Sequence, residues 1–221
     1  WLIDDIKMSK SLGNVIKPLD LADEFGSDSL RYFLMRNMVV GHDASFTLDS
    51  FIKRYNSDLA NDYGNLVNRI LILINKNFDN LVPEPNEYND IDLNLITKCK
   101  EIPNKVINNY NNLKIHDALE LIMELFRSLN KYLELKAPWK AIKEGEEGIQ
   151  NAATTLYIAA DILRIGTILI SPVMPKKTKL IFKYLGIKIT NDFTFGKLAA
   201  GSRINKPENL FQRIDEVNWY P

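Results

Sequence analysis

The chain has 221 residues, of which 46% are hydrophobic and 25% are charged, a composition typical of a globular protein with enough apolar side chains for a core. Basic and acidic residues both number 28, so the net charge of zero neither favours nor excludes nucleic-acid binding, and an RNA surface would have to come from local clustering. The single cysteine, Cys99, excludes an intramolecular disulfide and a cysteine-based structural zinc site, and it favours a reducing, cytoplasmic location.

Residues 1–47 predict a small mixed α/β segment. Asp20–Phe25 has the spacing of a short helical turn, which Gly26 would end. Ser27 is a candidate N-cap for a second helix directly after it, because serine side chains accept hydrogen bonds from the first free amides of a helix. Met38–Val40 predicts a short strand before the next glycine.

From Thr47 onward the pattern is helical, and residues 48–221 predict an α-helical bundle with a C-terminal tail. Apolar side chains from Ile52 to Leu73 recur at spacings of three and four, which places them on one face of a long helix with Thr47 as its N-cap. Pro83–Asp90 predicts a loop. Further helices are expected over about 93–111, 116–135 and 149–170, and from Pro175 to Gly186, followed by an irregular tail.

Prolines and apolar runs modify this outline. Pro103 should kink or split the helix that contains it, because a proline inside a helix lacks an amide donor and clashes with the preceding turn. Ala137–Pro138 should break or bend the third helix of the bundle. The apolar stretch Ile158–Met174 contains Asp161 and Arg164, so it predicts a buried helix rather than a membrane span.

Lys7–Ser11 combines two lysines with two hydroxyl side chains shortly before a glycine. Such a loop offers ammonium groups and donors to phosphate oxygens, although an arbitrary pentamer of this composition is more often a solvated surface loop. As a literal string, Lys-Met-Ser-Lys-Ser resembles the second signature of the class I aminoacyl-tRNA synthetases. The resemblance implies a loop that closes over ATP, in which Lys10 and Lys7 stabilise charge on the leaving pyrophosphate and Ser9 and Ser11 add donors.

Later segments narrow the resemblance to the methionyl members of that class. Leu30–Arg36 resembles the segment that braces the signature loop, Asp58–Arg69 resembles the entry helix of the anticodon-binding domain, and Ala137–Lys140 resembles its Ala-Pro-Trp motif. The similarity runs in order through nearly the whole chain. It implies a mainly α fold, in which the signature loop and a stem-contact segment precede the helical anticodon-binding bundle of class Ia enzymes.

Two groups of side chains are candidates for reading RNA. Asn65 and Arg69 are four residues apart, so they share a helix face beside the apolar stripe and both should be partly accessible; a solvated polar pair is the simpler alternative. Trp139, after Pro138, is either a packing plug or a platform on which an RNA base stacks. The resemblance implies that Asn65, Arg69, Pro138 and Trp139 contact the CAU anticodon.

The resemblance further implies a parent enzyme, a cytoplasmic methionine–tRNA ligase that joins methionine to tRNA(Met) with ATP and Mg²⁺, and no membrane or DNA partner. In the family, most of the nucleotide fold precedes the position of Trp1. The chain alone is therefore expected to hold no cofactor and to bind the anticodon stem-loop without activating methionine. The separated His42 and His116 predict no metal site. Two alternatives stay open: a fragment of another class Ia synthetase, and a non-catalytic helical module that binds protein.

Overall fold

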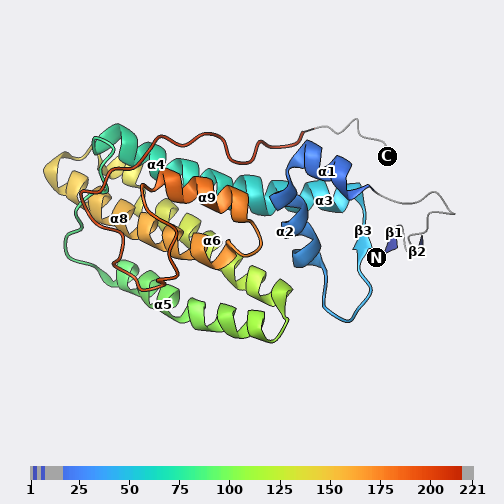
Figure 1. The fold of residues 1–221 in the computed structure, drawn as a ribbon. Coiled ribbons are helices and arrows are strands. Elements are labelled where there is room, and N and C mark those ends of the chain that lie inside the picture. Colours follow the sequence, from blue (N-terminus) through green and yellow to red (C-terminus); the bar gives the residue numbers. More distant parts are fainter. Residues whose placement is uncertain (1, 4–5, 8–16, 216–221) are drawn as a thin grey trace.

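The computed structural model describes residues 2–3, 6–7 and 17–215, and Figure 1 shows them as an elongated helical bundle with a small sheet at one end. The three short strands are β1 (Leu2–Ile3), β2 (Ile6–Lys7) and β3 (Ser45–Phe46). They form a sheet of order β2-β1-β3, in which β1 is antiparallel to β2 and parallel to β3. The predicted mainly α fold with a small mixed segment in front is confirmed.

Two short helices, α1 (Pro18–Phe25) and α2 (Ser27–Asn37), come next in the described chain. Gly26 separates them with a positive φ of 85°, a conformation that favours glycine. The prediction that Ser27 caps the second helix is wrong, because Gly26 occupies the N-cap position and no side chain caps it.

The strand predicted at Met38–Val40 is also wrong. Val39 and Val40 are 42% and 47% exposed in a turn, so no buried face selects an extended conformation there. The strand β3 forms instead where Phe46 is buried, with its ring centroid 5.2 Å from that of Phe33 and 6.2 Å from that of Phe51.

The long helix begins at the predicted N-cap. The Thr47 side chain accepts a hydrogen bond from the Ser50 amide, and the Ser50 hydroxyl accepts one from the Thr47 amide, so the two residues form a capping box. Three segments then follow without a break: α3 (Leu48–Arg54), the π-helical η2 (Tyr55–Gly64) and α4 (Asn65–Asn77). The apolar spacing predicted one long helix, but it did not predict its π-helical middle.

The other helices are α5 (Asp90–Asn111), α6 (Ile115–Lys136), the short α7 (Pro138–Ala141), α8 (Gly145–Ile170) and α9 (Pro175–Tyr184). Pro103 lies inside α5 without splitting it. Ala137 ends α6 in the left-handed region, with φ 40°, and Pro138 starts α7. The break predicted at Ala137–Pro138 is therefore confirmed.

Helix α8 is the centre of the bundle, and all its residues from Ala152 to Ile170 are buried. Among the described residues, α8 alone has the length and apolar composition of a membrane span, and the whole of its apolar window is buried inside the bundle. The prediction of a buried helix is confirmed. Close packing explains Gly166, since an added Cβ would lie 2.3 Å from the Phe126 ring of α6. That ring also stacks on Tyr63 of η2, with centroids 4.4 Å apart.

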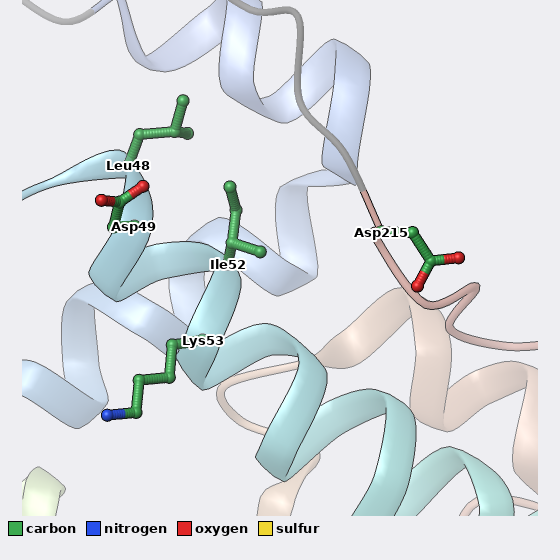
Figure 2. A pocket seen from close by; sticks show the side chains of 5 residues that line it. All are labelled: Leu48, Asp49, Ile52, Lys53 and Asp215. Atoms are coloured by element: carbon green, nitrogen blue, oxygen red, sulfur yellow. The ribbon is translucent and has the colours of Figure 1, made fainter.

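After α9 the chain folds back along the bundle as an irregular tail, residues 185–215, as predicted. The tail reaches the start of the long helix, where the Asn56 side chain exchanges two hydrogen bonds with the backbone of Ile214. Figure 2 shows Asp215 across a shallow pocket of about 350 Å³ from Leu48, Asp49, Ile52 and Lys53.

Helix α2 packs against α6, η2 and α9 as well as α1, and the Arg31 side chain donates hydrogen bonds to the carbonyls of Pro172 and Val173. The front segment is therefore attached to the bundle along several helices. The division into domains at residues 47 and 48 stays a prediction.

Candidate nucleic-acid interface

The signature loop contributes little to the described structure. Lys7 is the last residue of β2, and only its backbone placement is described. Ser9, Lys10 and Ser11 lie outside the described residues. The ATP-binding and catalytic roles of all four residues therefore stay predictions.

Asn65 and Arg69 occupy the first two turns of α4. Their neighbours Leu66 and Ile70 are fully buried and fix the helix against the bundle, so Asn65 is exposed and the Arg69 side chain is 37% exposed. The expectation that both side chains are accessible is confirmed. Accessible polar groups at this spacing are available to an external ligand.

Trp139 lies in the first turn of α7. The left-handed Ala137 turns the chain sharply after α6, and Pro138, which is buried, suits the first position of the next helix because its φ is already helical. Trp139 is half-buried: part of it packs against the core and the rest remains accessible. It is therefore both a packing residue and an available aromatic surface.

The structure brings Arg69 and Trp139 together. The Arg69 guanidinium lies 5.1 Å from the centroid of the Trp139 ring, within the range of a cation–π contact. Arg69 Nη1 also lies 2.7 Å from Oε1 of Glu134, in the last turn of α6. We call Arg69, Glu134 and Trp139 the Arg69 cluster.

Glu134 was not identified from the sequence. It is 65 residues from Arg69, and no spacing rule links the two. The only local signal is its position in the last turn before the Ala137 break, which brings the end of α6 close to α7. Contact with α4 depends on how the helices pack.

A buried network holds the end of α6 in place. Asp92, which is 1% exposed, accepts hydrogen bonds from the Asn89 amide at 3.0 Å and the Tyr132 hydroxyl at 2.8 Å, and its Oδ1 lies 3.0 Å from Lys136 Nζ. Burial, followed by the charge of Asp92, raises the pKa of Tyr132, so its hydroxyl stays a donor. The start of α5 is thereby tied to the turn that precedes Trp139.

These contacts define what the Arg69 cluster can do. A partly exposed guanidinium beside a half-buried indole offers aromatic surface for stacking and further N–H donors for the edge of a base. Glu134 balances the charge of Arg69, so the cluster favours recognition of a base over simple attraction of phosphate. Within the described ranges, no three histidine, cysteine or acidic side chains lie close enough together to hold a metal ion.

Two family models together match most of the chain. A family model described as "tRNA synthetases class I (M)" matches residues 1–71, and one described as "Anticodon binding domain of methionyl tRNA ligase" matches residues 82–219.

Among curated proteins, the methionine–tRNA ligase of Caldanaerobacter subterraneus subsp. tengcongensis is 42% identical over 97% of this chain, and that of Clostridium tetani is 39% identical over 97%. The crystal structure of Mycobacterium tuberculosis methionyl-tRNA synthetase bound by methionyl-adenylate matches with 35% identity and a TM-score of 0.90 over 93% of this chain. This chain covers 34% of each of the two curated relatives and 42% of the solved chain, so it spans less than half of their length.

Proposed function

Because this chain belongs to the methionine–tRNA ligase family, we propose that it is the anticodon-reading part of an enzyme that joins methionine to tRNA(Met). The parent enzyme uses ATP and Mg²⁺, and the loop that contains Lys7, Ser9, Lys10 and Ser11 contributes to ATP binding and to activation of the amino acid. Membership of the methionyl family excludes the alternative of a fragment from another class Ia synthetase.

The observation that carries the proposal is the Arg69 cluster. Its guanidinium contacts both the Trp139 ring and the Glu134 carboxylate, and the Arg69 side chain remains 37% exposed. Asn65, one turn earlier on the same helix, is exposed and supplies both a donor and an acceptor. In the proposal, these residues read the CAU anticodon, and Pro138 fixes the position of Trp139. A role in translation places the protein in the cytoplasm, which suits the unpaired Cys99.

Binding of a labelled RNA hairpin tests this function. A stem-loop that carries CAU and a matched one with a changed anticodon are titrated with the chain and with Trp139→Ala at one stated salt concentration. Loss of a stacking platform costs about 1–3 kcal/mol per base, so the affinity for the CAU loop should fall by roughly tenfold or more. Trp139→Phe is the matched control, because it keeps an aromatic ring and should retain most of the preference for CAU.

The RNA result also separates this function from the remaining alternative. A helical module that binds only protein would bind both stem-loops equally weakly, whether or not Trp139 is replaced. That result would contradict the proposed anticodon reading. Circular dichroism of each variant checks that α7 and its neighbours remain folded.

A further inference from the structure

A groove lined by apolar side chains and lysines lies on α9, and none of its lining residues belongs to the Arg69 cluster. It is open to solvent and encloses about 550 Å³, within the range of ligand-binding sites. Its lining includes four lysines, Lys176, Lys179, Lys183 and Lys188, which we call the basic edge, and apolar side chains such as Leu180 and Ile189, which we call the floor. We call it the α9 groove.

The groove exists because the chain reverses after α9. Gly186 has a positive φ of 69°, and an added Cβ there would lie 2.0 Å from the carbonyl oxygen of Arg203. The turn lets the Ile187 amide donate a hydrogen bond to the carbonyl of Phe182 at 3.1 Å, so the following residues return beside the helix. The outer face of α9 and this returning segment form the two sides of the groove.

The basic edge belongs to a segment of the sequence without acidic residues. All four lysines are exposed, and no aspartate or glutamate occurs between Pro175 and Ile189. Within the described part of the chain, the ion pairs involve none of the four. Since the whole chain has no net charge, this basic cluster is a local feature.

The α9 groove and the Arg69 cluster have no residue in common. Arg69 points to Glu134 of α6. The tail covers another side of the long helix, where Phe211 packs on Tyr55 and Tyr63. The tail is also joined to α9, since Asn205 donates hydrogen bonds to the carbonyls of α9 residues 183 and 184. In Figure 1 the red tail and α9 lie together in the front of the bundle. The groove is thus built from α9 and the segment after it, whereas the Arg69 cluster is built from α4, α6 and α7.

The floor of the groove favours a protein partner over nucleic acid. Leu180 is 39% exposed and Ile189 is 62% exposed. Contact with a charged phosphate backbone would not stabilise this apolar surface, whereas contact with apolar side chains of a partner would. Phe182, the aromatic side chain of the lining, is buried and offers no stacking surface. We propose that the α9 groove docks an amphipathic helix of a partner protein, whose apolar stripe covers Leu180 and Ile189 and whose acidic flanks pair with the four lysines.

A pair of designed peptides tests this proposal on the full 221-residue chain. The first is a fluorescein-labelled helix of about 18 residues, or five turns, with leucine along one face and glutamate beside it; the second has lysine in place of each glutamate. Fluorescence anisotropy should show that the glutamate peptide binds and the lysine peptide does not. Charge reversal by Lys179→Glu with Lys183→Glu should lower the affinity for the glutamate peptide by at least about tenfold and allow the lysine peptide to bind.

The matched control reverses the charge of two exposed lysines elsewhere, by Lys100→Glu on α5 and Lys131→Glu on α6. It should leave the affinity for each peptide unchanged. Absence of binding by the glutamate peptide, or an equal effect of both double variants, overturns the proposal. A loss of affinity for the CAU stem-loop in Lys179→Glu with Lys183→Glu would also overturn it and identify the surface as an RNA contact. Concentration-dependent self-association that this variant abolishes would identify a second copy as the occupant instead.

Discussion

The single thiol gives a prediction at the scale of one residue. Cys99 is fully buried, and burial, followed by the charge of Asp161, raises its pKa to about 12. In the unfolded chain a cysteine titrates near pH 8.5, so above that pH the unfolded state loses a proton that the folded state keeps. The free energy of unfolding should therefore fall as pH rises from about 9 towards 12, by up to about 1.4 kcal/mol per pH unit.

Urea unfolding at pH 7, 8, 9 and 10 measures this slope, and Cys99→Ala is the comparison. The substitution removes the titrating group and adds a roughly constant loss of stability from the small cavity. The wild-type and variant curves should therefore converge above about pH 9. Curves that remain parallel to pH 10 would show that the thiol does not resist ionisation in the folded protein.

Side-chain partners could be predicted only where they are local in the chain. The accessibility of Asn65 and Arg69 follows from the helical spacing, because their buried neighbours fix the face on which they lie. Glu134 could not be predicted, since its contact with Arg69 depends on the packing of α6 against α4. The sequence also left open whether Trp139 is buried or accessible. Its burial depends on how α7 packs against the bundle, and the four residues of α7 are too few to show an apolar periodicity.

At the scale of an element, the capping box at Thr47 should stabilise the start of the long helix. Thr47→Ala removes the acceptor of the Ser50 amide and should lower the free energy of unfolding by about 1 kcal/mol. Thr97→Ala is a matched control, because Thr97 is exposed on α5 and the same atoms are removed there. Urea denaturation of both variants measures the difference. Equal losses would mean that the cap contributes nothing.

Elements with a strong pattern were predicted well, and those fixed by contacts were not. The long helices follow from apolar spacing over many residues, which few alternatives satisfy. Met38–Val40 has strand-forming residues but no buried face, and it remains a turn. The π-helical turns of η2 keep Leu59 and Tyr63 buried just as α-helical turns would, so the sequence pattern does not distinguish the two.

At the scale of the whole molecule, one buried ion pair fastens the tail to the bundle. Arg164 donates hydrogen bonds to Asp161 Oδ1 at 2.6 Å and to the carbonyls of Asp192 and Thr194 at 2.6 and 2.7 Å. Asp161 also accepts the Leu198 amide at 3.0 Å. Arg164→Met would leave a buried carboxylate without its partner charge and should cost about 3–5 kcal/mol of stability.

The double variant Asp161→Asn with Arg164→Met is the control, because it removes both charges and should lose clearly less. Urea denaturation gives the two values, and limited proteolysis of residues 185–215 reports release of the tail. If the single and double variants lose the same stability, the unpaired charge of Asp161 is not the cause of the loss in Arg164→Met. The sequence showed Asp161 and Arg164 inside an apolar helix, but their attachment of the tail required the three-dimensional structure.

The returning tail has a consequence for anything joined to this chain. β1 pairs with Ser45 and Phe46, and Asp215 lies beside Leu48 and Ile52, so both ends of the described chain meet at the start of the long helix. Arg69 is farther along that helix by some 20 residues, on the order of 25–30 Å at helical rise. A domain joined at either end would therefore be attached about that distance from Arg69. The helix acts as a fixed-length spacer between the attachment points and the Arg69 cluster.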